Sequence, residues 1–140
     1  MSANTAQNDY ERMVAEFHDA FDDRPVEAMT ADLLRLRRAL IAEEVRELFV
    51  EMDAAIAALD AGQAVPRAVQ ANMFKEAADV QYVLSGMAVK FGWPMAEVFA
   101  RVHASNMSKL GADGRPVRRD DGKVLKGPNY HPPQLDDLVG

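Results

Sequence analysis

Cysteine is absent from the 140 residues of this sequence. Disulfide bonds, thiolate metal sites and thiol nucleophiles are therefore excluded. No apolar run approaches the roughly 20 residues that a membrane-spanning helix needs, and the first residues lack the basic and apolar regions of a signal peptide. We therefore expect a cytoplasmic protein with no membrane partner.

An excess of positive charge is also absent, because the formal net charge is -6. Sequence-independent binding to nucleic acid depends on cationic contacts with phosphate, so we expect no nucleic-acid partner. The basic residues gather near the C-terminus, where residues 109–126 contain six lysines and arginines against three aspartates. A basic arm therefore follows an acidic body.

Hydrophobic residues make up 49% of the sequence and charged residues 27%, which is the ordinary balance of a globular protein. The length fits one domain, residues 1–140. Helical periodicity between glycine and proline breaks predicts an all-α, antiparallel bundle of four to five helices within residues 1–111. The expected helices cover residues 6–21, 30–62, 66–91 and 94–111, and the apolar side of the first contains Tyr10, Met13, Val14 and Phe17.

Local signals fix the expected helix ends. Thr30 is the predicted N-cap of the second helix, which stops near Gly62. Residues 112–140 are expected to form an irregular C-terminal arm, ordered or mobile. Two Asp-Gly dipeptides in this arm favour turns, and the segments 115–118 and 123–125 beside them could pair as a small hairpin.

The second expected helix carries carboxylates where its face should be apolar. At about 100° per residue, Glu44, Glu47 and Glu51 interrupt an apolar stripe, with Glu43 at its edge. Carboxylates that point into a bundle repel one another and lose hydration unless protons or cations compensate them. A glutamate run on a solvated helix face is the alternative interpretation. A second apolar stripe predicts contacts on another side of this helix; it consists of Leu34, Ile41, Val45, Leu48, Met52 and Leu59.

The third expected helix adds Glu76 on its apolar face and Asp79 at the border of that face. A short connection makes the second and third helices antiparallel neighbours. Glu47 lies about 14 residues before the end of one helix, and Glu76 and Asp79 lie about 10 and 13 residues after the start of the other, so the acids come level within roughly one turn. Their convergence would destabilise the bundle without metal and would bind phosphate with Mg²⁺.

All these candidate ligands are oxygens, which favours Mg²⁺ or Mn²⁺ over Zn²⁺. The three histidines, His18, His103 and His131, show no spacing of a zinc helix motif. We expect each of them on the surface or in ordinary packing.

The acid pattern Glu43-Glu44-x-x-Glu47 followed by Glu76-x-x-Asp79 resembles the signature of the all-α nucleoside triphosphate pyrophosphohydrolases, the MazG-like and phosphoribosyl-ATP pyrophosphohydrolase-like superfamily. The resemblance covers nearly the whole chain and points to a compact single-domain branch. The other segments that carry it are Phe17-His18, residues 33–40, Val102-His103-x-x-Asn106-x-x-Lys109-Leu110 and residues 121–128. The gap between the acid motifs is at the long end for this group, which bears on helix length.

This resemblance implies a house-cleaning hydrolase of phosphoric anhydrides. It implies Mg²⁺-dependent conversion of a nucleoside triphosphate, with dUTP or dCTP favoured, to the monophosphate and pyrophosphate. Carried over by position, the metal ligands are Glu44, Glu47, Glu76 and Asp79. The implied catalytic residues are Glu43 and Glu47, with Glu43 either beside the ligands or activating the attacking water.

Four residues toward the C-terminus are candidates for substrate binding. Asn106 falls on the apolar face of the fourth expected helix, where an amide is costly unless it is bonded; a structural role is the alternative. Lys109 follows one turn later and could meet a phosphate. Lys126 and Tyr130 in the arm could close over the nucleotide, unless the arm is an exposed basic tail.

Two other functions stay open at this point. One is a biosynthetic phosphoribosyl-ATP pyrophosphohydrolase, and the other is a non-catalytic helical dimer that binds a nucleotide or regulates a partner. The two apolar faces of the second expected helix predict a homodimer or a tetramer.

Overall fold

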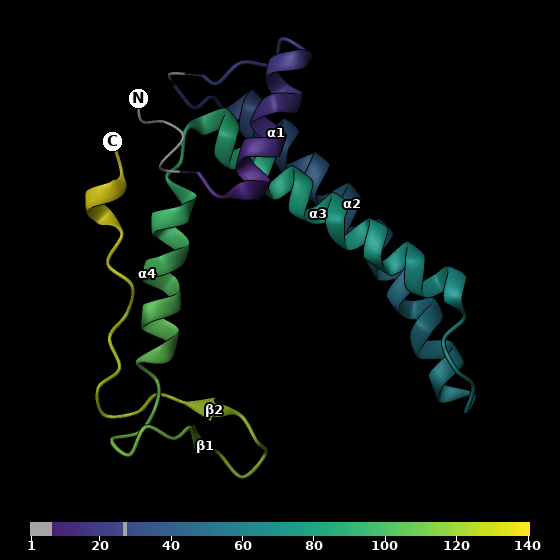
Figure 1. Ribbon diagram of the computed structural model, residues 1–140, viewed down its shortest axis with the longest axis vertical. Coiled ribbons are helices and arrows are strands. Elements are labelled where there is room, and N and C mark those ends of the chain that lie inside the picture. Colours follow the sequence, from purple (N-terminus) through teal and green to yellow (C-terminus); the bar gives the residue numbers. More distant parts are fainter. Residues whose placement is uncertain (1–6, 27) are drawn as a thin grey trace. The chain divides into compact units, whose positions relative to one another are not determined.

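The computed structural model describes residues 7–26 and 28–140. Within these residues the chain forms four α-helices and one two-stranded sheet (Figure 1), which confirms the expected all-α fold class. The chain divides after residue 93 into two compact units, one formed by Asn8–Trp93 and the other mainly by Pro94–Gly140. No helix in the described residues is both long and apolar enough to cross a bilayer.

The first unit contains α1 (Asp9–Ala20), α2 (Ala31–Asp60) and α3 (Arg67–Phe91). Each boundary has a local cause. The side chain of Asn8 caps α1 by accepting from the backbone N–H of Glu11. Thr30 Oγ1 accepts from the backbone N–H of Leu33 at 3.2 Å, which confirms the predicted N-cap of α2. α3 ends at Gly92, whose φ of 67° is a left-handed conformation that suits glycine.

α2 and α3 form an antiparallel hairpin around the connection 61–66 (Figure 1). α1 packs on α3. The hydrophobic residues that are buried in the described part of the chain are Val14, Ala55, Ala88 and Val89. These are small, so the core of this unit is thin and its larger apolar side chains stay partly exposed.

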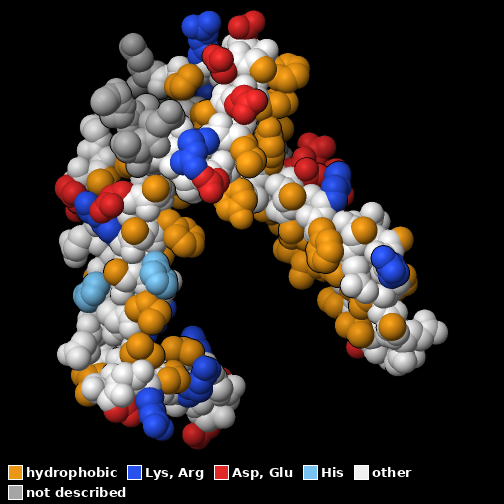
Figure 2. Space-filling model, in the orientation of Figure 1, with side chains coloured by type: hydrophobic (Ala, Val, Ile, Leu, Met, Phe, Trp, Pro, Cys, Tyr) orange, Lys and Arg blue, Asp and Glu red, His pale blue; other side chains and the backbone are white. Residues whose placement is uncertain are grey.

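Apolar side chains lie uncovered along the α2–α3 hairpin, and Figure 2 shows them gathered on this part of the molecule. Those more than half exposed are Leu36, Phe49, Val50, Ile56 and Leu59 of α2 and Phe74 of α3. The second apolar stripe predicted for α2 lies at an open groove, where Leu34, Ile41 and Val45 meet Met87 of α3. A single chain therefore covers one side of α2 and leaves another apolar side uncovered.

A buried polar cluster ties α1 and the following loop to α2 and α3. Asp23 accepts a hydrogen bond from Lys90 Nζ at 2.5 Å and another from Arg37 Nη2 at 3.3 Å. His18 Nε2 lies 3.8 Å from the same carboxylate. Lys90 also donates to the carbonyl of Arg24 at 2.8 Å. His18 therefore lies in ordinary packing, as predicted, and shares one carboxylate with two permanent cations.

This packing predicts a pH dependence of stability. Burial lowers the pKa of His18 from its ordinary value of 6.5, the charge of Asp23 opposes the shift, and the charges of Arg37 and Lys90 add to it. The folded protein therefore binds fewer protons here than the unfolded chain, so the free energy of unfolding should fall as the pH drops below 6.5. Asp23 has its pKa lowered from 3.8, chiefly by the Lys90 hydrogen bond, and titrates outside this window.

Denaturant unfolding at a series of pH values between about 7.5 and 5.5 measures this effect. A His18→Asn variant is the control, because it cannot take up a proton there. The variant should lose most of the fall in stability. An equally steep fall in the variant would assign the pH dependence to another group.

The second unit contains α4 (Met95–Met107), β1 (Val117–Arg118), β2 (Val124–Leu125) and the 3₁₀-helix η2 (Asp136–Leu138). The strands are antiparallel, with Val117 opposite Leu125 and Arg118 opposite Val124. The hairpin predicted for the arm is therefore confirmed. We had expected α4 to continue to residue 111, but it ends at Met107, because the chain forms turns from Ser108 onward, before it reaches Gly111.

The arm is fastened to α4. Arg101 holds the carboxylate of Asp137 through two hydrogen bonds, of 2.6 and 3.1 Å. The buried Ser105 donates from its hydroxyl to the carbonyl of His131 at 2.8 Å. Of the two expected states of the arm, the structure therefore shows the ordered one.

Candidate metal centre

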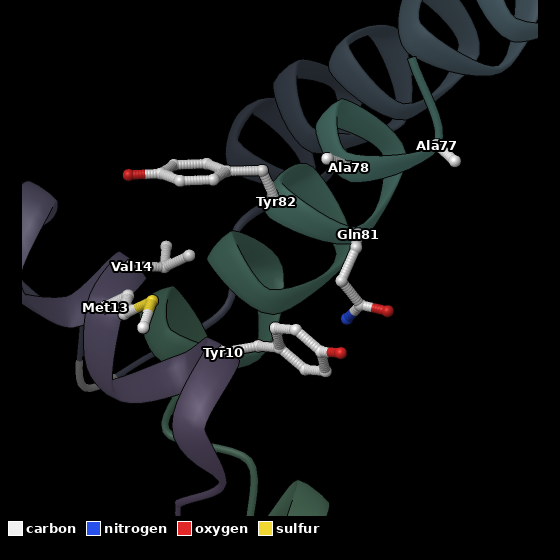
Figure 3. A pocket seen from close by; sticks show the side chains of 7 residues that line it. All are labelled: Tyr10, Met13, Val14, Ala77, Ala78, Gln81 and Tyr82. Carbon is white, nitrogen blue, oxygen red and sulfur yellow. The ribbon is translucent and has the colours of Figure 1, made fainter. Parts of the chain in front are cut away.

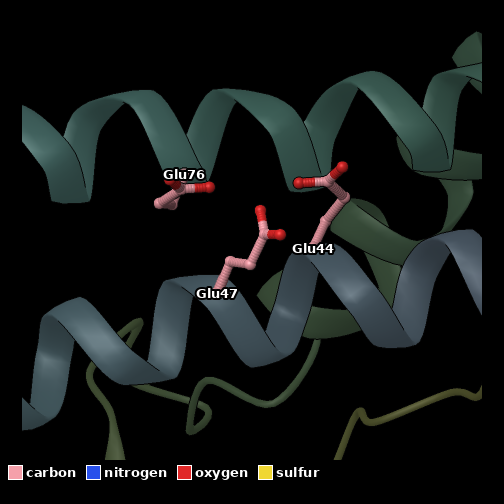
Figure 4. Close-up of side chains that lie close together, drawn as sticks. All are labelled: Glu44, Glu47 and Glu76. Atoms are coloured by element: carbon pink, nitrogen blue, oxygen red, sulfur yellow. The ribbon is translucent and has the colours of Figure 1, made fainter.

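Acids from both helices of the α2–α3 hairpin face one another (Figure 4). Glu44 and Glu47 come from α2 and Glu76 comes from α3, and one carboxylate oxygen of each lies within 4.8 Å of the other two. A spacing of three residues puts the first two on one helix face, and the antiparallel pairing brings Glu76 to the same height. The predicted convergence of acids from the two helices is confirmed for these three residues.

Two further acids act on this trio electrostatically. Burial raises the pKa of Glu44, and the nearby charges of Glu47, Asp79 and Glu43 raise it further. The side chain of Asp79 is 36% exposed, and Glu43 is exposed on α2. Burial and the surrounding negative charge therefore both make the ionised form of Glu44 more costly than that of a free glutamate, which raises its pKa.

Two carboxylate oxygens of the centre, Glu44 Oε2 and Glu76 Oε2, are buried without a hydrogen-bond partner in the described structure. A buried charged acceptor without a partner loses its hydration and gains nothing in return. Hard divalent cations take oxygen ligands, mainly carboxylates. The donor set and its unpartnered oxygens therefore fit Mg²⁺ or Mn²⁺.

Lys75 of α3 also belongs to this centre. Its Nζ lies 2.9 Å from Asp79 Oδ2 and 3.3 Å from Glu76 Oε1, and its side chain is 65% exposed. Sequence reasoning missed this residue. Its signal was the spacing of four residues to Asp79, which lets opposite charges meet on a helix.

The predicted substrate-binding residues lie in the second unit. The ammonium of Lys126 lies 4.7 Å from the centre of the Tyr130 ring, close enough for a cation to be attracted to the ring face. The backbone N–H of Gly127 donates to the carbonyl of Lys109 at 2.8 Å, so the arm brings these three candidates to one end of α4. Asn106 is exposed. The expectation of a costly buried amide at this position was therefore wrong.

A groove between α1 and α3, of about 360 Å³, was not anticipated from the sequence (Figure 3). It is lined by Tyr10, Met13, Val14, Ala77, Ala78, Gln81 and Tyr82. Tyr10, Met13 and Phe17 were expected to pack inward with Val14, but they are 60%, 66% and 44% exposed. The expectation was wrong for these three because α1 buries the side that carries Val14 and His18. Tyr10 and Met13 lie along the open groove, and Phe17 contacts the rings of Phe21 and Tyr82.

Comparison with known protein families identifies a match over most of the chain. The sequence model for phosphoribosyl-ATP pyrophosphohydrolase matches residues 14–106. This span contains α2 and α3 complete, and with them every acid of the candidate centre. No curated protein matches the chain.

Proposed function

This chain belongs to the phosphoribosyl-ATP pyrophosphohydrolase family, and on that premise we propose that it uses Mg²⁺ to hydrolyse a nucleoside triphosphate to the monophosphate and pyrophosphate. The family is part of the MazG-like all-α superfamily of nucleoside triphosphate pyrophosphohydrolases. Membership makes the chain a pyrophosphohydrolase, that is, a hydrolase acting on phosphoric anhydrides. The metal and the identity of the triphosphate are our proposal.

One observation carries the metal part of the proposal. Glu44, Glu47 and Glu76 offer oxygens within 4.8 Å of one another, and two of the three carboxylates have a buried oxygen without a partner. We assign these three residues and Asp79 as the ligands of Mg²⁺, with Mn²⁺ as a substitute that suits the same oxygens.

The bound ion would stabilise the charge that develops on the phosphate oxygens and would make a bound water more acidic. We assign Glu43 and Glu47 to hold the attacking water and to accept its proton. The water oxygen would form a bond to the α phosphorus while the bond from that phosphorus to the oxygen bridging the α and β phosphates breaks. The β and γ phosphates would leave together and keep the electron pair of that bond, so the products are the monophosphate and pyrophosphate.

The second unit would supply contacts to the substrate. Lys109 and Lys126 carry the charges that phosphate oxygens attract. We assign Tyr130, held by Lys126, and the exposed amide of Asn106 to the nucleoside part. The short distance between Lys126 and Tyr130 and the contact of Gly127 with Lys109 support these assignments.

The favoured substrates are dUTP and dCTP, because the sequence resembles the compact single-domain branch that cleans up nucleotides. Phosphoribosyl-ATP is the alternative, because the matched family is named for it. The deciding experiment is a panel of deoxynucleoside triphosphates and phosphoribosyl-ATP with Mg²⁺ and then with Mn²⁺, with monophosphate, diphosphate, pyrophosphate and phosphate separated.

Each result of this substrate panel supports a different function. Pyrophosphate release from dUTP or dCTP supports the house-cleaning role. Release from phosphoribosyl-ATP alone transfers the chain to the biosynthetic alternative. No hydrolysis of any compound with either metal would overturn the enzymatic proposal and favour a non-catalytic nucleotide-binding dimer.

We also propose that copies of this chain associate through the uncovered apolar side of the α2–α3 hairpin. Exposed apolar surface of this extent is typical of an interface, and a second copy carries the same face. Phe74→Asp should shift the assembly toward monomer, because Phe74 is 74% exposed in the single chain. Light scattering at micromolar concentration measures the mass, and a monomeric wild-type protein would contradict the proposal.

A further inference from the structure

Lys75 is the basic partner of the candidate metal ligands. In the described part of the chain, the ion pairs of the four proposed ligands all involve this one side chain, which contacts Asp79 at 2.9 Å and Glu76 at 3.3 Å. Both contacts are with carboxylates of α3 that the metal proposal assigns as ligands; at Glu76 the ammonium contacts Oε1, while Oε2 is the buried oxygen without a partner. The ammonium of Lys75 therefore supplies positive charge at the carboxylates where we place the metal ion.

The ammonium and a divalent ion would compete for these carboxylate groups. An ammonium that stays at hydrogen-bond distance from Glu76 and Asp79 would lie within a few ångströms of a metal bound by the same carboxylates, where two cations repel strongly. The ammonium end of both ion pairs is open to water, although the Glu76 side chain is only 13% exposed, and water screens an ion pair that it reaches. The lysine can therefore leave the carboxylates at small cost, because its side chain is 65% exposed and unhindered by packing.

The displaced ammonium has one attractive destination. It stays on α3, within a side-chain length of the acids, and therefore close to any phosphate chain that the bound metal holds. Lysine is a flexible point charge that binds phosphate through rotatable N–H donors. Its charge-assisted hydrogen bonds to phosphate oxygens would replace those to the carboxylates.

We propose that Lys75 is a resident counter-cation that is exchanged during binding: it neutralises Glu76 and Asp79 before metal arrives, yields them to the divalent ion, and then binds the phosphate chain of the substrate. The phosphate half of this proposal rests on the proposed function. Lys75 would thus bind two negatively charged partners in turn, first the carboxylates and then the phosphate chain.

The first test is a calorimetric titration of Mn²⁺ without nucleotide, on wild type, Lys75→Met and Lys75→Arg. Removal of the competing cation should make Lys75→Met bind Mn²⁺ several-fold more tightly, whereas the arginine variant keeps the charge and should resemble wild type. Equal affinity in wild type and Lys75→Met would overturn the exchange while leaving the metal centre intact. No Mn²⁺ binding by wild type would overturn the metal centre as well, so the two failures are distinguishable.

The second test uses inorganic tripolyphosphate, which carries the phosphate chain common to nucleoside triphosphates, at saturating Mn²⁺. Lys75→Met should bind it about tenfold more weakly, because a hydrogen bond to a charged group is lost, and Lys75→Arg should restore most of the affinity. Lys123→Met, in the exposed hairpin turn of the second unit, is the matched control and should bind as wild type does. We expect Lys75→Met to have a higher affinity for Mn²⁺ and a lower affinity for tripolyphosphate than wild type. Unchanged tripolyphosphate affinity in Lys75→Met would overturn the phosphate role.

Discussion

Glu47→Gln should reduce turnover by about 100- to 1000-fold, since metal stabilisation of the attacked phosphate is worth several kcal/mol and each 1.4 kcal/mol or so changes a rate tenfold. The substitution keeps the shape of the side chain and removes one charge from the trio with Glu44 and Glu76. Mg²⁺ should also raise the melting temperature of the variant less than that of wild type. Pyrophosphate release and melting curves with and without Mg²⁺ measure both effects.

Without metal, the same variant should be no less stable than wild type and could gain stability. The raised pKa of Glu44 means that the folded state holds this proton more tightly than the unfolded chain does, so its stabilising contribution is lost as the pH rises past the ordinary value of 4.5. Removing the neighbouring charge of Glu47 relieves part of that loss at neutral pH. Asp53→Asn is the matched control, because Asp53 is an exposed acid on the same helix outside the trio. A Glu47→Gln protein that melts earlier without metal and hydrolyses at full rate would overturn the metal assignment.

Gly127→Ala should push the middle of the C-terminal arm away from Lys109 and Leu110, which follow α4. A Cβ at Gly127 would lie 2.2 Å from the carbonyl oxygen of Leu110 and 2.8 Å from that of Lys109. Both contacts are with backbone, which cannot rotate away as a side chain does, so the segment that places Lys126 and Tyr130 must move. The expected loss in kcat/KM is about 10- to 100-fold, because charge-assisted contacts with the phosphates are worth about 1.5–3 kcal/mol each.

Gly122→Ala is the control for this substitution. Gly122 has a φ of 87°, so alanine there is strained, but a Cβ would meet no atom within 4 Å. It should cost only about 1 kcal/mol locally and leave hydrolysis close to wild type. Limited proteolysis should cut the arm of Gly127→Ala faster than that of Gly122→Ala. Equal resistance to proteolysis and equal kcat/KM in both variants would show that the contact of Gly127 with Lys109 and Leu110 does not affect substrate binding.

Much of the acidic centre could be predicted from the sequence because its geometry is local. Glu44 and Glu47 share a face through helical periodicity alone. The height of Glu76 follows from counting residues along two helices that a short connection forces to be antiparallel. The helix ends at Thr30 and Gly92 could also be predicted, because a helix cap depends on the capping residue and its three or four neighbours in sequence.

Other features depended on which face of a helix meets a neighbour, and the sequence does not contain that information locally. Tyr10 and Met13 form an apolar stripe with Val14, yet the structure leaves the first two along an open groove. Lys75 looked like an ordinary exposed lysine until its position over two acids of the same helix was known. Asn106 was judged buried from periodicity, which identifies a face but not whether anything covers it.

The short connection between α2 and α3 also has a consequence for the stability of the folded chain. All the acids of the centre lie between Glu43 and Asp79, and they meet when one helical hairpin closes. Closing the hairpin brings like charges together, which opposes the step. A divalent ion bound at this centre would offset that repulsion, so the free energy of metal binding would add to the stability of the closed hairpin.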